Sequence, residues 1–211
     1  MNNKRSTPDK IVLAGKQLFH VYGYKNTTMQ MIADKASITK SLLTYHFPKK
    51  QFILIKIMGT FLSAIYNFAK EKSNSDPLLA YFITSNLFYS YLFNEENIHF
   101  GEEILNRNDR NDLLTYENFQ VLYVDIIKYF NVNISFNTLV LREIVIYGSN
   151  KEVLNNYLSN SIQVSLDSVI EHITENTCRL LEISDHIIQE YRIKAAELFP
   201  HIDYSHIRLF E

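Results

Sequence analysis

The stretch that most constrains the fold is residues 28–47, TMQMIADKASITKSLLTYHF, because it predicts two short helices held at an angle by a tight turn. Apolar residues recur at helical spacing in both halves, at Met29, Ile32, Ala33 and Ala36 and then at Ile38, Leu43 and Phe47. Ser37 lies where the chain must turn. Thr28 and Thr39 are suited to cap the two helices, since each hydroxyl can accept a hydrogen bond from a free backbone N–H. The pattern is that of a helix-turn-helix.

The second of these helices has a polar outer face that suits contact with duplex DNA. Donors, acceptors and methyl groups are the mixture that recognises phosphates and base edges in a major groove. The residues expected to face the groove are Gln30, Lys40, Ser41, Leu42, Thr44, Tyr45 and His46. Thr28, Thr39 and Lys50 are better placed for phosphates. Leu42 suits a thymine methyl, with a core position beside Leu43 as the alternative, and for His46 the alternative is simple solvation.

Charge divides unevenly along the chain, and the division favours the same interpretation. Residues 1–50 contain nine Lys or Arg and two Asp, a net charge of +7, whereas residues 51–211 carry a net charge of −9. Such a division is expected when one end of a protein binds a polyanion and the other end stays off it. The bland alternative is that the split only reflects surface solvation.

From Ile11 to Leu54 the chain resembles the DNA-binding domain of the TetR (tetracycline-repressor) family of bacterial regulators. The residues that carry the resemblance are Ile11, Ala14, Leu18, Phe19, Gly23, Tyr24, Thr27, Thr28, Ile32, Ala33, Ala36, Ile38, Thr39, Lys40, Leu43, Phe47, Pro48 and Lys50. They agree in order and without gaps. The chain departs from the family pattern at Ser37, Ser41, Thr44 and His46, and the last two commonly meet DNA in the family, so the operator sequence stays open.

The remainder predicts an all-α protein with two domains: a three-helix DNA-binding domain at residues 1–50 and a larger helical domain at 51–211 for effector binding and dimerisation. Helical periodicity and polar breaks predict the helices 8–22, 48–72, 77–94, 98–107, 111–130, 136–148, 151–178 and 184–199. Gly23 is expected to end the first helix in a left-handed conformation. The fourth helix, which crosses the domain boundary, is expected to couple the domains.

Two late segments show apolar stripes that suit pairing between two copies of the chain. One stripe contains Leu158, Ile162, Leu166, Val169 or Ile170, Ile173 and Leu180, and the other contains Ile183, Ile187, Tyr191, Ala195 and Leu198. Two such helices pair with their own copies into a four-helix bundle, and the resemblance implies this homodimer through residues 151–199. The alternative is that both faces pack inside a monomer.

Residues 81–130 are rich in aromatic side chains, which suggests a ligand pocket between helices. Small-molecule pockets in helical bundles are mostly apolar with a few polar groups. The expectation is an effector cavity lined by Phe68, Phe88, Phe119 and Tyr123 that takes an apolar or aromatic molecule. Against it stands the observation that aromatic stripes at helical spacing more often form core.

The sequence contains no complete catalytic constellation, metal site or cofactor motif. Glu96 and His99 form a single Glu-x-x-His pair, whereas a di-iron bundle requires two pairs and further carboxylates. The polar start without an apolar run, the single Cys178 and the absence of a stretch of membrane-spanning length favour a cytoplasmic protein.

These observations favour a ligand-responsive transcriptional regulator, and a repressor is the first choice within that class. It is expected to bind a palindromic operator as a dimer, with no enzymatic activity, and to leave DNA when a small molecule shifts the fourth helix. One alternative is a helical-bundle enzyme whose basic N-terminal domain is incidental. Another is an architectural DNA-binding protein that responds to no effector.

Overall fold

The computed structural model describes residues 6–106 and 113–210, and for residues 113–118 it describes the backbone alone. Within these ranges the chain forms helices and no strand, so the predicted all-α class is confirmed. The helices are α1 (Thr7–Asn26), α2 (Met29–Lys35), α3 (Lys40–His46), α4 (Lys50–Lys72), α5 (Pro77–Phe93), α6 (Ile98–Leu105), α7 (Leu113–Tyr129), α8 (Phe136–Leu158), α9 (Leu166–Leu180), α10 (Asp185–Leu198) and the 3-10 turn η1 (Phe199–His201). The predicted ends at residues 107 and 111 lie outside the described residues.

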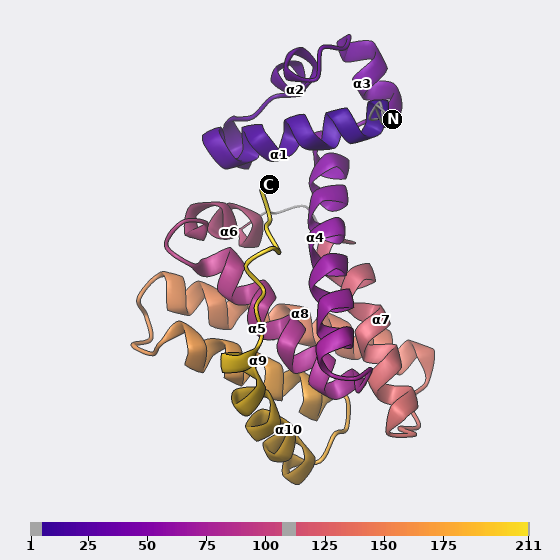
Figure 1. Cartoon of the computed structure of the whole chain (residues 1–211), viewed down its shortest axis with the longest axis vertical. Helices are drawn as coiled ribbons and strands as arrows, with labels where there is room; N and C mark the ends of the chain where they lie inside the picture. Colours follow the sequence, from indigo (N-terminus) through magenta and orange to yellow (C-terminus); the bar gives the residue numbers. More distant parts are fainter. Residues whose placement is uncertain (1–5, 107–112, 211) are drawn as a thin grey trace.

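The helices α1, α2 and α3 form a small unit at one end of the molecule (Figure 1). The predicted caps are present: the Thr28 hydroxyl accepts from the Met31 N–H and the Thr39 hydroxyl accepts from the Leu42 N–H, both at 3.2 Å. Ser37 makes the turn between α2 and α3 with φ of 56°, a left-handed conformation that glycine adopts more easily. The helix-turn-helix predicted over residues 28–47 is therefore confirmed.

The long helix α4 leaves this unit and runs down into the bundle formed by the later helices, where it packs against α5 and α7 (Figure 1). The expectation that no stretch is long enough to span a membrane is wrong for α4, because its 23 residues suffice by length and composition alone. Half of the apolar stretch is buried against other helices of the chain. Its apolar character is explained by its place in the core, since it must present apolar side chains to α1, α5 and α7 in turn.

The predicted break at residues 148–150 is wrong, because α8 continues without interruption from Phe136 to Leu158. A single glycine costs a helix only about 1 kcal/mol relative to alanine, and Gly148 is tolerated here. The helix ends at a cluster of small polar residues, where Asn160 adopts φ of 57°. A new helix, α9, begins after Ser165, whose hydroxyl caps it by accepting a hydrogen bond from the Ser168 N–H at 3.2 Å. The predicted helix 151–178 is therefore two helices.

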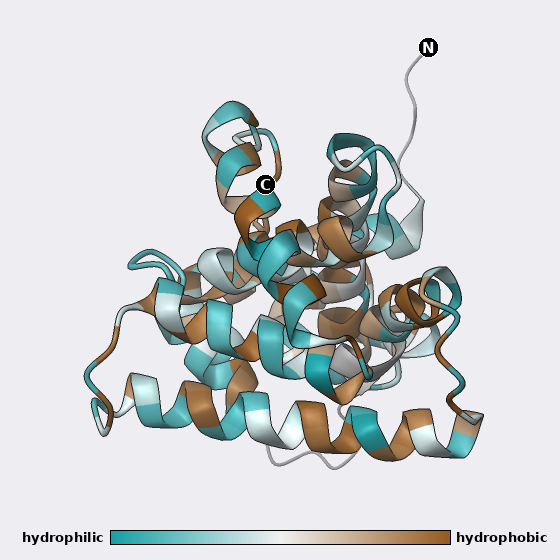
Figure 2. Ribbon diagram, turned by 90° about the horizontal axis from the view of Figure 1, so that it is seen from below, coloured by the Kyte–Doolittle hydropathy of each residue, from teal (hydrophilic) through white to brown (hydrophobic). Residues whose placement is uncertain are grey.

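The apolar stripes of α9 and α10 are mostly buried inside this chain. Val169, Ile173 and Tyr191 are buried against neighbouring helices, and α9 packs on both α5 and α8. Viewed from below, teal and brown segments alternate along the outer helices, as expected for amphipathic helices with one face on the core (Figure 2). The intramolecular alternative thus describes the buried part of these faces, and the dimer interface over residues 151–199 stays a prediction.

After η1 the chain returns toward the N-terminal unit, and its end lies between α1 and α6 (Figure 1). The Phe210 ring lies 4.8 Å from the His20 ring on α1 and 4.9 Å from the Phe100 ring on α6, measured between centroids. Ile207 and Leu209 are buried. This C-terminal segment therefore packs against both parts of the molecule.

Candidate nucleic-acid interface and ligand pocket

The helix α3 presents nearly all of its side chains away from the protein. Of its seven residues Leu43 alone is buried, and Leu42 is 40% exposed, so the alternative of a core position for Leu42 does not apply. Tyr45 is 81% exposed and its ring packs edge-on to His46, with centroids 5.2 Å apart. An exposed helix of this kind leaves its side chains free to meet base edges.

The remaining predicted groove residues surround this face, and two of them are partly occupied by local hydrogen bonds. Gln30 on α2 donates to the Asp34 carboxylate at 2.8 Å, and the Thr44 hydroxyl donates to the Lys40 carbonyl oxygen at 2.9 Å. Lys40, Ser41, Thr28 and Thr39 are exposed. The oxygen of each threonine hydroxyl already accepts a helix N–H group, which fixes the position of the oxygen. The hydroxyl hydrogen can still be donated to a phosphate.

Lys50 has a role inside the protein that sequence reasoning missed. Its ammonium group donates to the main-chain oxygens of Tyr24 and Thr27, the latter at 2.5 Å, and it lies 4.3 Å from the centroid of the Tyr24 ring. A cation in the first turn of α4 opposes the helix dipole, and these carbonyl groups offset that cost. Lys50 therefore holds residues 24–27, the last turn of α1 and its link to α2, which are together called here the loop after α1, whereas the sequence suggested only a phosphate contact.

Glu103 on α6 binds the same loop through its carboxylate. Its carboxylate accepts hydrogen bonds from the backbone N–H groups of Tyr24, at 2.5 Å, and Lys25, at 3.2 Å. Gly23 precedes them with φ of 77° and ψ of 167°, and a Cβ there would lie 2.9 Å from the carboxylate oxygen. The left-handed φ predicted for Gly23 is confirmed, although α1 resumes after it and ends at Asn26. This contact, here called the α6 clamp, joins the larger domain to the DNA-binding unit.

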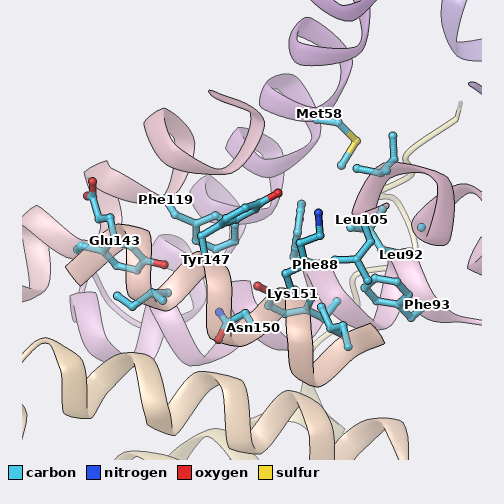
Figure 3. Close-up of a pocket in the computed structure, with 16 residues that line it drawn as sticks. Met58, Phe88, Leu92, Phe93, Leu105, Phe119, Glu143, Tyr147, Asn150 and Lys151 are labelled. Carbon is cyan, nitrogen blue, oxygen red and sulfur yellow. The ribbon is translucent and has the colours of Figure 1, made fainter. Parts of the chain in front are cut away.

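A largely apolar cavity lies between α4, α5, α6, α7 and α8, with a volume of about 90 Å³ (Figure 3). A buried water needs roughly 10–15 Å³ on the same scale, so the cavity has room for several atoms of a small molecule. Its walls are formed by Met58, Phe88, Tyr89, Leu92, Phe93, Gly101, Ile104, Leu105, Phe119, Tyr123, Glu143, Ile146, Tyr147, Asn150, Lys151 and Leu154. Such a cavity between helices fits the default description of a ligand site.

Three of the four predicted ligand residues meet in this cavity. The rings of Phe88 and Phe119 are 5.3 Å apart and nearly perpendicular, and Phe119 stacks on Tyr123 at 6.2 Å. Phe68 lies elsewhere, because it sits further along α4 and faces the ring of His206 in the C-terminal segment at 5.4 Å. Helical spacing placed Phe68 on a buried face of α4 but gave no information about which neighbour covers it.

Glu143 is the least expected member of the wall. Its side chain is 4% exposed, and burial raises the pKa of its carboxyl group, an effect that a hydrogen bond from Gln120 to Oε2 at 3.4 Å opposes. Oε1 finds no hydrogen-bond donor in the described part of the chain. The periodicity of α8 held the signal, since Leu139, Ile146 and Asn150 mark the buried face on which Glu143 lies.

The fold and these two sites define a class of protein: a helix-turn-helix DNA-binding regulator with a separate helical domain around an internal cavity. Residues 11–57 match the family described as bacterial regulatory proteins, tetR family. Residues 11–57 therefore form the N-terminal domain of a tetR-family regulator, and the resemblance seen in the sequence is confirmed for this region.

Solved structures support the fold across most of the chain. The FadR repressor of Thermus thermophilus, in complex with lauroyl-CoA, is similar with a TM-score of 0.60 and 14% identity, covering 82% of this chain and 92% of that one. The fatty acid degradation regulator FadR from Bacillus halodurans is similar with a TM-score of 0.50 and 18% identity, over 85% of this chain and 97% of that one. At these identities the likeness concerns the fold. Comparison with curated protein sequences finds no match.

Proposed function

We propose that this chain represses transcription by binding a palindromic operator as a homodimer, and that a small molecule in the cavity releases it. One observation carries the proposal: two helices each touch both the DNA-binding unit and the cavity. Lys50 on α4 holds the loop after α1 while Met58 on the same helix lines the cavity. Glu103 on α6 binds that loop while Ile104 lines the cavity.

The DNA contacts follow from the exposed surface of α3. Lys40, Ser41, Leu42, Thr44, Tyr45 and His46, with Gln30 from α2, face the major groove in this proposal, and Thr28 and Thr39 meet phosphates. The test is a gel-shift titration with duplex DNA from upstream of the gene. Tyr45→Ala is expected to weaken specific binding about tenfold, the weight of one good base contact. Tyr204→Ala removes an exposed tyrosine of the C-terminal segment, outside the helix-turn-helix, and is expected to leave binding unchanged.

The homodimer is proposed to form through the outer face of α8. Leu141, Ile144 and Val145 are each more than half exposed there, and a Cβ added to Gly148 would meet no described atom within 4 Å. The outer faces of α9 and α10 carry ion pairs, including Arg179 with Glu175 at 2.9 Å, which suits contact with water. A second copy of the chain is the expected occupant of the apolar face, because a two-fold operator requires two recognition helices one helical turn of DNA apart.

Sedimentation of the purified protein tests this interface. Leu141→Asp places a charge in the proposed interface and is expected to yield monomers that lose operator binding. Ile193→Asp is the matched control, since Ile193 is 54% exposed on α10, outside the α8 face. If both variants remain dimers, or if both dissociate, the α8 interface is contradicted.

Release by ligand is proposed to act through α4 and the α6 clamp. A molecule larger than the cavity is expected to displace side chains of α4 and α6, and both helices hold the loop after α1. A shift of that loop changes the separation of the recognition helices in a dimer. Because the Thermus thermophilus structure contains lauroyl-CoA, fatty acyl compounds belong in the first screen beside aromatic compounds.

The same titration separates the alternatives. A repressor binds duplex DNA at low ionic strength and is released by at least one compound that also raises its melting temperature. Binding that no compound reverses would identify an architectural protein. Failure to bind duplex DNA under these conditions would contradict the regulator itself and favour the helical enzyme.

A further inference from the structure

The cavity contains a carboxylate whose hydrogen bonding is incomplete within the described chain. Glu143 on α8 is almost fully buried, and Oε1 has no donor among the residues described. The bond from Gln120 to Oε2 is long, at 3.4 Å. Buried polar atoms are satisfied in the great majority of cases, because an unpaired acceptor loses its bonds to water without replacement. A bound molecule that donates to Oε1 would remove this cost.

The side chains around Glu143 indicate the rest of that molecule. Tyr123 lies close enough that the carboxylate raises its pKa, after burial as the larger cause, and it stacks on Phe119, which in turn meets Phe88 edge-on. Aromatic faces beside a carboxylate attract a cation as well as an apolar body. An ammonium group held by Glu143 would therefore contact rings on its apolar side.

Lys151 gives the bound molecule a direction. It lines the same cavity eight residues further along α8, which corresponds to about 12 Å along the helix axis. In Figure 3 Glu143 lies at one end of the labelled side chains, while Lys151 lies toward Phe88 and Leu92. Two positive charges repel in a medium of low polarity, so a cationic group is favoured at the Glu143 end and disfavoured near Lys151.

We propose that the effector is an amine with an apolar alkyl or aromatic body, whose N–H group donates to Glu143. The assignment rests on the proposed function, because it specifies the ligand of the same cavity. This ligand class differs from the acyl compounds that the lauroyl-CoA complex of the Thermus thermophilus protein suggests. The alkyl chain of an acyl thioester has no hydrogen-bond donor that could bind a carboxylate.

A matched set of ligands with one chain length tests the proposal by calorimetry, in the absence of DNA. Decylamine supplies a positive charge and hydrogen-bond donors, and decyltrimethylammonium supplies a positive charge without a donor. Decanol supplies a neutral donor, and the anion decanoate supplies neither a positive charge nor a donor. Decylamine is expected to bind at least about tenfold more tightly than decyltrimethylammonium and decanoate, which is the weight of a charge-assisted hydrogen bond. Equal binding of decylamine and decanoate would overturn the proposal, as would failure of decylamine to bind.

Two variants show whether Glu143 is responsible. Glu143→Gln keeps the shape and removes the charge, so decylamine is expected to lose about tenfold in affinity while decanol binds as before. Glu152→Gln is the control on the exposed side of α8. An unchanged decylamine affinity in Glu143→Gln would overturn the assignment. A gel shift on the same preparations separates the two hypotheses, because loss of DNA binding contradicts the regulator, whereas DNA binding with release by a non-amine contradicts the amine alone.

Discussion

Glu103 and Glu143 are both carboxylates at helix contacts, and they differ in how their lone pairs are used. Glu103 on α6 accepts two backbone N–H groups from the loop after α1, and Gly23 leaves space for its oxygens. Glu143 on α8 has a long bond to one oxygen and none to the other within the described residues. A satisfied carboxylate stabilises the junction of two domains, whereas an unsatisfied one beside a cavity carries an energetic cost that the proposed ligand would remove.

The largest expected effect is at Gly23, which makes the Glu103 contact possible. Gly23→Ala is expected to lower the free energy of unfolding by about 2–4 kcal/mol, since its φ and ψ are nearly exclusive to glycine and the new Cβ would displace the carboxylate. Gly148→Ala, measured in the Leu141→Asp variant because Gly148 lies on the proposed dimer face, is the matched control: in the interior of α8 with open space around it, alanine should stabilise by about 0.5–1 kcal/mol. Urea denaturation measures both, and equal effects would contradict the α6 clamp.

The next effect is expected at Lys50, the cation that holds the same loop. Lys50→Ala removes the donor to the carbonyl oxygens of Tyr24 and Thr27 and should lower stability by about 2 kcal/mol. Lys49→Ala removes the same charge from an exposed neighbour and should change stability little. If instead Lys50→Ala melts normally and reduces the salt dependence of DNA binding by about one ion, Lys50 is a phosphate contact after all.

Removing Glu103 itself is expected to have a smaller effect on stability, and a clear effect on how readily the effector releases operator DNA. Glu103→Ala leaves two N–H groups that water can reach, so the loss is about 1 kcal/mol. The variant should still bind operator DNA, while the effector concentration needed for release rises. Glu102→Ala is the control, because the half-buried Glu102 on α6 lies beside His99 within the same helix. Unaltered release in the Glu103 variant would show that α4 alone transmits the signal.

The DNA-binding unit was predictable because its signals are local. The capping residues Thr28 and Thr39 and the turn at Ser37 act within four residues of themselves, so the sequence determines them directly. The contacts of Lys50 and Glu103 were not predictable, since each depends on where a distant helix lies. The same reason explains Phe68, which helical spacing made buried without showing that the C-terminal segment covers it.

Long-range packing also determined what α8, α9 and α10 do. Amphipathic stripes in α9 and α10 predicted a dimer interface, yet the same pattern serves a helix that packs on α5 within one chain. The more informative signal was a mismatch: α8 carries apolar residues on its outer face, where Leu141 and Val145 are exposed. A sequence pattern shows that a face is apolar, but only the fold shows which faces still lack a partner.

Substitution of the two carboxylates is expected to change stability by similar amounts but with opposite signs. Glu143→Gln should stabilise the ligand-free protein by about 1 kcal/mol at neutral pH, because it removes a buried charge that is incompletely hydrogen bonded. Burial raises the pKa of Glu143, so the folded state binds its proton more readily than the unfolded chain does. The native protein should therefore lose stability, relative to the variant, as pH rises above the ordinary value of 4.5, and the difference should level off once the folded-state pKa is passed.

Parallel denaturation curves of the native and Glu143→Gln proteins between acidic and neutral pH measure this difference. Other carboxylates, such as Glu190 and Asp203, titrate in both proteins and cancel. A difference independent of pH would mean that the Glu143 carboxyl titrates alike in folded and unfolded chains, and a Gln variant less stable than the native protein would mean that the carboxylate is already satisfied. Either result would place Glu143 with Glu103 as a structural contact, and the cavity would lose the polar group that distinguishes it from core.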